Sequence, residues 1–345
     1  YARPNQATGS ADTVPSDLAL HFAGAGRLPM GADLMSPARA RRPSPGVLIV
    51  PDTGPADRNG PAVPGSIPDP LYADLAQALA QKGISSLRYD PRGQGESTMP
   101  AGTPLRFSDL VGDARGGLDF LAGRADVDAA HLAVLGEGAG GLVALQLAAQ
   151  DPAVKAVVLV STPGRPMPAS LADEVRATAP TPAEGDALAT ELQSVAAAVA
   201  AGAPVPGPAQ LPSALRPIFP SGEDAFLRSL FSFDPLGVAR SVHIPVLVLR
   251  GAVDPSNTAG DAQALVAALG AGAQPMVAAQ ANHTLNIVSV VIPSATASPV
   301  DPHQAMSTVV GGRATVVRDT ATLTAVAEWV GARFQAPLKG TPQGS

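Results

Sequence analysis

The sequence contains no cysteine, only three lysines (Lys82, Lys155 and Lys339) and no long uninterrupted apolar run. The absence of cysteine excludes disulfide scaffolds, cysteine-ligated metal sites and cysteine nucleophiles. A membrane-spanning helix needs about 20 mostly apolar residues, so we expect no membrane span. Aromatic residues form 3% and charged residues 15% of the chain, because alanine, glycine and proline dominate its composition.

Positive charge is also scarce: 23 basic and 29 acidic residues give a formal net charge of −6. One short basic run, ARARR at 38–42, stands in a proline-rich segment and does not build the basic surface that nucleic acids require. We therefore expect no nucleic-acid partner. With 46% hydrophobic residues, a chain of 345 residues can bury a substantial globular core.

Apolar runs alternate with helical patterns along most of the chain, after an opening hairpin expected within 17–35. This alternation predicts an α/β fold with a mostly parallel, doubly wound sheet that is covered by helices on both faces. Strands are expected at 45–50, 84–90, 131–135, 154–162, 244–251 and in 274–283, and helices at 71–83, 106–123, 141–150, 259–270 and 320–334.

Residues 165–235 interrupt this alternation with proline- and alanine-rich helical patches. Insertions in such folds lie over the carboxyl ends of the strands, where ligands bind, so we predict a helical lid or cap. The core is then expected to comprise 17–164 and 236–335, with an extra loop of unassigned purpose at 288–312.

Both ends of the sequence are polar. We expect an extended or disordered lead over 1–16 and a flexible tail over 336–345. The lead begins without methionine, as a mature secreted terminus or a shortened chain would. The first of these readings favours a secreted, periplasmic or cell-envelope protein.

Four segments, each following an expected strand, resemble the motifs of one family. They are PDTGPADRNG (51–60), LRYDPRGQGES (87–97), LGEGAGG (135–141), and the pair LRGAVD (249–254) and ANHTLN (281–286). In this order they resemble the α/β-hydrolase superfamily, and within it the bacterial serine hydrolases grouped with dienelactone-hydrolase-like and prolyl-oligopeptidase-like esterases and peptidases. The resemblance runs from about residue 17 to about residue 335 and implies the α/β-hydrolase fold.

The resemblance also implies roles for individual residues. In such enzymes a serine on a strained strand-to-helix turn attacks an acyl carbon, a histidine removes its proton, and an acid orients the histidine. Asp254 matches the acid, His283 matches the histidine, and Gly138 stands where the serine belongs. The oxyanion-loop candidates are Asp52, Thr53 and Ala139, and the pocket-lining candidates are Glu137, Asp57 and Arg58.

The departure at Gly138 removes the covalent mechanism, because glycine has no side chain to attack a substrate. Its surroundings differ as well. Glu137 replaces the usual histidine, and Pro51-Asp52 replaces the His-Gly pair that opens the oxyanion loop. Proline supplies no N–H, and a carboxylate at Asp52 opposes the negative charge that an oxyanion site stabilises. We expect the side chain of Glu137 to turn toward polar loops beside this strand-to-helix turn, which is called the nucleophile elbow.

These features lead to a first hypothesis: a pseudohydrolase that retains Asp254 and His283 but has no nucleophile. It would bind a small acyl, peptide or glycan ligand under the 165–235 lid, or a protein partner as an accessory subunit. The alternative is an enzyme, either a serine hydrolase inactivated on purpose at Gly138 or one with an unrecognised mechanism.

A third hypothesis rests on the same turn, since Gly136, Gly138 and Gly141 also fit the nucleotide-binding pattern G-x-G-x-x-G. That pattern expects an acidic residue after the next strand, where this chain has Val160-Ser161-Thr162-Pro163. Nucleotide binding is therefore the lesser alternative. No metal-ligand spacing is present in the sequence, and we expect no cofactor.

Overall fold

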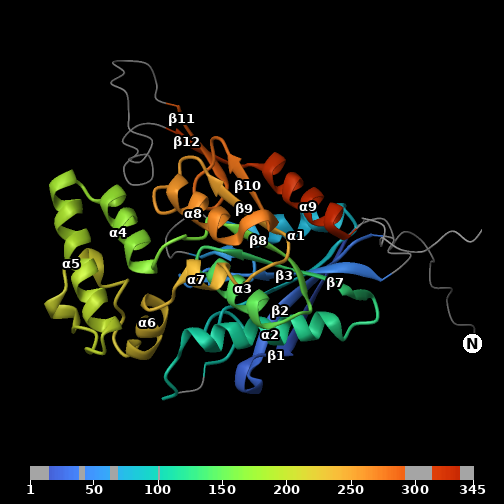
Figure 1. The fold of residues 1–345 in the computed structure, drawn as a ribbon, viewed down its shortest axis with the longest axis horizontal. Helices are drawn as coiled ribbons and strands as arrows, with labels where there is room; N and C mark the ends of the chain where they lie inside the picture. Colours follow the sequence, from blue (N-terminus) through green and yellow to red (C-terminus); the bar gives the residue numbers. More distant parts are fainter. Residues whose placement is uncertain (1–14, 39–42, 63–68, 100–101, 292–312, 335–345) are drawn as a thin grey trace, which may run out of the picture.

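The structure is a computed structural model that describes residues 15–38, 43–62, 69–99, 102–291 and 313–334. Its centre is an eight-stranded sheet in the order β1-β2-β6-β3-β7-β8-β9-β10 (Figure 1). The strands of this sheet are β1 (Ser16–Ala23), β2 (Pro29–Ser36), β3 (Ser44–Val50), β6 (Ser85–Tyr89), β7 (Val127–Glu137), β8 (Val154–Val160), β9 (Val246–Gly251) and β10 (Ala273–Ala278).

Strand direction confirms the predicted mostly parallel sheet. β2 runs antiparallel to both of its neighbours, β1 and β6, and every other neighbouring pair is parallel. β1 and β2 form the expected opening hairpin, and β1 begins at Ser16, inside the predicted lead. Residues 1–14 of that lead and the tail predicted over 336–345 lie outside the described residues.

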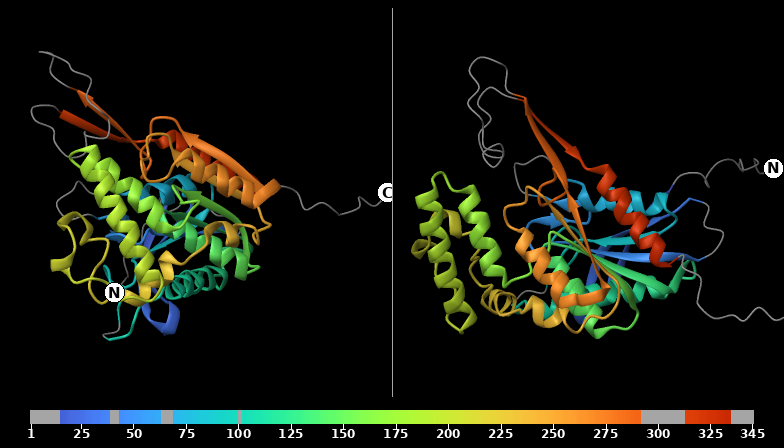
Figure 2. Two further views of the ribbon diagram at one scale, coloured as in Figure 1. Left: turned by 60° about the vertical axis from the view of Figure 1, so that its left-hand side comes forward. Right: turned by 45° about the horizontal axis from the view of Figure 1, so that its top comes forward.

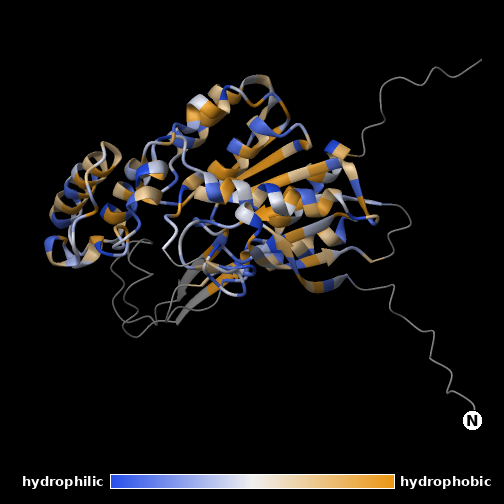
Figure 3. Ribbon diagram, turned by 90° about the horizontal axis from the view of Figure 1, so that it is seen from below, coloured by the Kyte–Doolittle hydropathy of each residue, from blue (hydrophilic) through white to orange (hydrophobic). Residues whose placement is uncertain are grey.

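Helices cover both faces of the sheet, which explains why its central strands are apolar on both sides. One hydrophobic cluster joins α2, α3 and α8 to one face, and a second joins α1 and α9 to the other. The central strands accordingly stand out as hydrophobic between less hydrophobic helices (Figure 3). The helices are α1 (Leu71–Gln81), α2 (Phe107–Ala122), α3 (Ala139–Gln150), α8 (Ala259–Leu269) and α9 (Thr320–Phe334).

The segment between β8 and β9 forms a separate group of helices beside the sheet (Figures 1 and 2). It contains α4 (Met167–Thr178), α5 (Pro182–Ala200) and α6 (Asp224–Phe231), and the short helix α7 (Pro235–Ala239) that follows lies against α3 and α8. The hydroxyl of Ser170 on α4 donates to the carbonyl oxygen of Ser256, 2.5 Å away, in the loop after β9. This contact places α4 beside the carboxyl end of β9. The function of the group as a lid remains a prediction.

The loop predicted over 288–312 is wrong at its beginning. Residues Asn286–Val291 form β11, which pairs antiparallel with β12 (Arg313–Arg318). The valine-rich composition of both segments favours the extended conformation. In both views of Figure 2 the pair points away from the sheet. Residues 292–312 lie outside the described residues.

Two short strands, β4 (Ala56–Asp57) and β5 (Gly60–Pro61), pair within the loop that follows β3. This loop begins next to the turn between β7 and α3, where Asp52 contacts Ala139.

Among the described residues, no helix combines the length and the apolar character needed to cross a bilayer.

Candidate active site

The turn between β7 and α3 has the backbone of a nucleophile elbow. Gly138 separates the last residue of β7 from the first of α3 and has φ 55° and ψ −124°. Glycine adopts this left-handed region at little steric cost. A Cβ at Gly141 would lie 1.8 Å from Oγ1 of Thr162. Close packing of the helix on β8 therefore explains this glycine without a bound phosphate.

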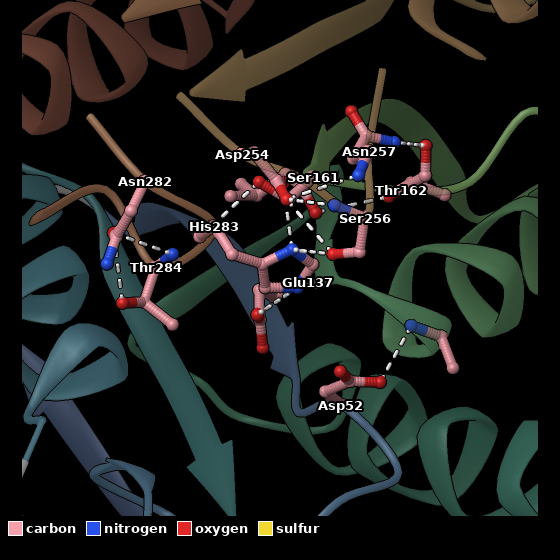
Figure 4. A network of polar contacts seen from close by, with 12 residues as sticks. Asp52, Glu137, Ser161, Thr162, Asp254, Ser256, Asn257, Asn282, His283 and Thr284 are labelled. Carbon is pink, nitrogen blue, oxygen red and sulfur yellow. Dashed lines mark hydrogen bonds and ion pairs between the residues drawn. The ribbon is translucent and has the colours of Figure 1, made fainter. Parts of the chain in front are cut away.

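Asp254 and His283 lie in contact, as the resemblance implied (Figure 4). Asp254 follows β9, His283 follows β10, and Oδ2 of Asp254 is 2.8 Å from Nδ1 of His283. The other carboxylate oxygen of Asp254 accepts hydrogen bonds from the backbone N–H groups of Ser256 (2.9 Å) and Asn257 (3.1 Å). The carbonyl oxygen of His283 accepts a hydrogen bond from the Ser161 hydroxyl at 2.7 Å. The imidazole is therefore fixed from both its ring and its backbone.

Glu137 lies buried beside the elbow, with one partner in the loop after β10 and one on helix α1. Only 1% of the residue is exposed, and its Oε1 lies 3.0 Å from Nε2 of His283. Its Oε2 accepts a hydrogen bond from the Tyr72 hydroxyl at 2.7 Å. The reason is strand alternation: Glu137 shares a face of β7 with Leu135, which packs in the same cluster as Tyr72. The inward direction is set by β7, and Tyr72 and His283 supply the polar partners there.

The carboxylate of Asp52 accepts hydrogen bonds from the backbone N–H groups of Thr53 and Ala139, the other two residues that the resemblance implied for the oxyanion loop. Its Oδ1 accepts the N–H of Thr53 at 2.7 Å and the N–H of Ala139 at 2.8 Å (Figure 4 draws the second bond). The N–H of Asp52 itself donates to the Tyr72 hydroxyl at 3.0 Å. A Cβ at Gly138 would lie 2.4 Å from Oδ2 of Asp52. The carboxylate therefore fills the space next to the elbow.

Burial and charge set the protonation of this cluster. Burial and the charge of Glu137 raise the pKa of Asp52 to about 6. Burial disfavours the imidazolium form of His283, but the charges of Asp254 and Glu137 outweigh it and hold the His283 pKa well above its ordinary value. Burial likewise opposes ionisation of Asp254, yet His283 keeps the Asp254 pKa below its usual range. The two neighbouring acids therefore favour the charged form of the imidazole.

Two predicted pocket-lining residues make their contacts elsewhere. The guanidinium of Arg58 pairs with Asp90 at 2.6 Å and with Asp33 at 2.9 Å, and it also contacts Glu96. The carboxylate of Asp57 accepts the backbone N–H of Asn59 at 2.6 Å within its own turn. Both residues shape the loop after β3, and neither joins the contacts of His283.

Sequence reasoning missed two members of the cluster. Tyr72 bonds both Glu137 and Asp52, and Oγ of Ser256 lies 3.0 Å from Oδ1 of Asp254 and 3.2 Å from Nδ1 of His283. Tyr72 stands in the first turn of α1, where the sequence shows only an apolar helix face. Ser256 stands two residues after Asp254, and its N–H donates to the Asp254 carboxylate. This Asp-x-Ser spacing is a local sequence signal that could have identified Ser256.

Asp52, Glu137 and His283 also form a group of possible metal ligands, because one atom of each lies within 4.8 Å of the others. The three residues come from three distant parts of the chain, which is why spacing in the sequence did not reveal them. With Asp254 on the other ring nitrogen, the carboxyl groups of Asp52, Glu137 and Asp254 lie around the one imidazole, so acidic groups outnumber basic ones here.

Comparisons with known proteins match parts of the sequence. A family model described as "Serine aminopeptidase, S33" matches residues 70–194. The chain is 43% identical to an uncharacterized protein of Mycobacterium tuberculosis over 84 residues, which cover 24% of this chain and 28% of that protein. It is 29% identical to esterase EstD of Thermotoga maritima over 134 residues, which cover 39% of this chain and 31% of the esterase. The matches thus span less than a third of the length of either curated relative.

The fold is found in solved structures as well. The α/β hydrolase GrgF from Penicillium superposes with a TM-score of 0.53 at 19% identity, over 78% of this chain and 91% of that one. This likeness concerns the fold and agrees with the mostly parallel central sheet. Together with the family match and the esterase relative, these features show that the chain belongs to the α/β-hydrolase superfamily.

Proposed function

We propose that this protein is a pseudohydrolase, which keeps the α/β-hydrolase scaffold but binds a ligand where its relatives cleave one. The observation that carries the proposal is the position of Asp52, whose carboxylate accepts the N–H groups of both Thr53 and Ala139 beside Gly138. A serine hydrolase needs a nucleophile at this elbow and free donors for the oxyanion that forms. Here glycine stands at the elbow, and the donors are already engaged by an anionic group.

The electrostatics of the site support the same proposal. One lost oxyanion-hole donor weakens catalysis by about 2.7–4 kcal/mol. A carboxylate in the hole does more than remove a donor, because it repels the negative charge that develops there. His283 is also engaged, since its Nε2 lies 3.0 Å from Glu137. The imidazole atom that would accept the proton of a nucleophile therefore has a carboxylate as its partner.

The family match does not supply the missing chemistry. It covers residues 70–194 and so includes the elbow but not Asp52, Asp254 or His283. Aminopeptidase or esterase activity consequently has no support from the residues that would perform it. Among acyl, peptide and glycan ligands, peptide amines and glycan hydroxyls suit the site better than a carbonyl oxygen, because they donate hydrogen bonds to carboxylates.

Deliberate inactivation by a single change at Gly138 is not supported by the packing. A serine there would bring its Cβ to 2.4 Å from Oδ2 of Asp52, unless Asp52 adopted another position. Nucleotide binding is also disfavoured, because the carboxylate of Asp52 accepts the Ala139 N–H at the start of α3. A pyrophosphate would need that donor and would meet a negative charge.

The experiment compares the purified protein with a reconstructed variant carrying Asp52→Gly, Glu137→His and Gly138→Ser. Both are assayed with p-nitrophenyl acetate, p-nitrophenyl butyrate and an aminoacyl p-nitroanilide, and both are treated with a fluorophosphonate probe. We expect no turnover and no labelling of the natural sequence, and labelling of the reconstructed variant at position 138. Turnover by the natural sequence that His283→Ala abolishes would refute the proposal.

A further inference from the structure

We propose that Asp52, Glu137 and His283 form a binding site for one divalent transition-metal ion of the zinc class. The three side chains converge at the carboxyl end of β7, with one ligand atom of each inside a 4.8 Å span. Oε1 of Glu137 and Nε2 of His283 are already 3.0 Å apart. Two ligands of a tetrahedral zinc ion at ordinary bond lengths lie about 3.3 Å apart, so this pair is close to ligand spacing.

The third ligand atom is available to the site. Oδ1 of Asp52 accepts both backbone hydrogen bonds, and within the described residues Oδ2 accepts none. Oδ2 is also the atom that a Cβ at Gly138 would approach to 2.4 Å, so it points at the elbow. One carboxylate oxygen of Asp52 already lies within 4.8 Å of the ligand atoms of Glu137 and His283.

His283 is oriented as metal-binding histidines are. A ligating imidazole almost always has a carboxylate or carbonyl oxygen on its other nitrogen, which fixes the ring and makes the ligand more basic. Asp254 provides this carboxylate 2.8 Å from Nδ1. Asp254 is itself held by the backbone N–H groups of Ser256 and Asn257, so the whole arrangement is rigid. Nε2 is thereby directed at Glu137 and Asp52.

The charge around the site calls for a cation. Three carboxylates share one imidazole, and none of the ion pairs formed by the described residues joins Asp52, Glu137 or Asp254 to a lysine or arginine. Buried carboxylates are normally paired or bound to a metal.

The ligand set selects the kind of ion. One imidazole nitrogen and two carboxylate oxygens suit zinc, cobalt, manganese or iron, whereas magnesium and calcium prefer oxygen alone. Three protein ligands leave a fourth position for water or a bound molecule. The inference goes beyond the proposed loss of serine chemistry and does not depend on it.

The test is a titration of chelator-treated, tag-free protein with Co²⁺ and Zn²⁺. We expect one Co²⁺ per chain with visible absorption bands of a low-coordinate nitrogen and oxygen site, and one Zn²⁺ per chain by calorimetry. His283→Ala and Glu137→Gln should abolish the absorption bands. Asp254→Asn, which changes only the orienting carboxylate, should weaken binding roughly 10–100-fold at unchanged stoichiometry.

The matched control is His131→Ala, because the half-buried His131 has Asp128, 2.7 Å from its Nδ1, as its one carboxylate partner among the described residues. This variant should bind both ions as the natural sequence does. Circular dichroism checks the fold of each variant, and the cobalt spectrum of the natural sequence needs no variant. Absence of a stoichiometric ion, or unchanged affinity in His283→Ala and Glu137→Gln, would overturn the inference.

The outcomes also separate this inference from the proposed function. If the metal-loaded protein hydrolyses esters, the pseudohydrolase proposal fails and the metal site stands. If no metal binds and no ester is cleaved, the metal site fails and the pseudohydrolase proposal stands.

Discussion

Gly138 and Asp52 are matched to each other: a Cβ at Gly138 would lie 2.4 Å from Oδ2 of Asp52. The backbone at Gly138, with φ 55° and ψ −124°, keeps the elbow form, while the carboxylate occupies the space that a nucleophile would need. A side chain added at Gly138 would therefore meet two costs, the left-handed backbone and the contact with Asp52, and the two can be measured separately.

We expect Gly138→Ser to lower the free energy of unfolding by about 2–4 kcal/mol. Left-handed backbone accounts for about 1–2 kcal/mol of this loss, and contact with Asp52 accounts for the rest. The control is Gly270→Ser, because Gly270 has φ 68° and ψ −142° and open space around its Cβ position. Measured against Asp52→Gly alone, the double variant Asp52→Gly/Gly138→Ser should show only the loss seen at Gly270. Equal losses from Gly138→Ser in the natural and the Asp52→Gly backgrounds in urea unfolding would contradict this account.

Glu137 should stabilise the fold through Tyr72 and His283. Glu137→Ala removes the acceptor of the Tyr72 hydroxyl and one partner of the imidazolium, for an expected loss of about 2–4 kcal/mol. Tyr72→Phe should lose about 1–2 kcal/mol, and the two changes should not be additive because they share one hydrogen bond. A double-mutant cycle in urea checks the coupling.

The charge of Glu137 contributes to the raised pKa of His283, after that of Asp254. In chelator-treated protein, Glu137→Gln should therefore lower the His283 pKa, as followed by the chemical shifts of the imidazole ring. The surface residue His131 serves as an internal reference. An unchanged His283 titration would mean that Glu137 does not act on the imidazole.

Asp90 should make the fold sensitive to acid. Burial disfavours its ionised form, but hydrogen bonds from Arg58 and from the N–H of Glu96 outweigh this and keep the Asp90 pKa below its ordinary value of 3.8. The ionised carboxylate therefore stabilises the fold fully above pH 3.8, and this contribution is lost as the pH falls through the lower folded-state pKa. Asp90→Asn should lose about 2–4 kcal/mol at pH 7 because it leaves Arg58 with fewer partners.

The difference between Asp90→Asn and the natural sequence should shrink as the pH falls below 3.8. The matched control is Asp126→Asn, whose partner Arg124 lies at the surface and whose loss should stay within about 0.5 kcal/mol. Urea unfolding at several pH values measures both. A pH-independent difference for Asp90→Asn would show that its charge does not matter.

Dinucleotides should not bind at the glycine-rich turn. A ligand at about 100 times its Kd adds about 2.7 kcal/mol to stability, which a thermal shift detects readily. We expect no shift with NAD, NADP or FAD at millimolar concentration, because Asp52 holds the Ala139 N–H at the start of α3. A thermal shift of the natural sequence with any of the three cofactors would contradict this prediction.

The sequence predicted the sheet and most of its helices because apolar periodicity records burial directly. It also predicted the contact between Asp254 and His283, since motifs after successive strands meet at one end of a parallel sheet. It did not predict Tyr72 or its contact with Glu137. Those depend on which face of β7 packs against α1, a tertiary fact that leaves no periodic signal. The β11–β12 pairing was missed for a different reason: strands joined by a long connection carry no hairpin signature.

The buried carboxylate of Glu137 also bears on how this protein could change over generations. It holds Tyr72 of α1 and the imidazole after β10 to the end of β7. Under the proposed function, serine chemistry would require new side chains at 52, 137 and 138 together, because a Cβ at 138 meets Asp52 and Glu137 contacts Nε2 of His283. A variant with one replacement is expected to lose stability without gaining activity. Further change at this site is therefore expected to keep the carboxylates of Asp52 and Glu137.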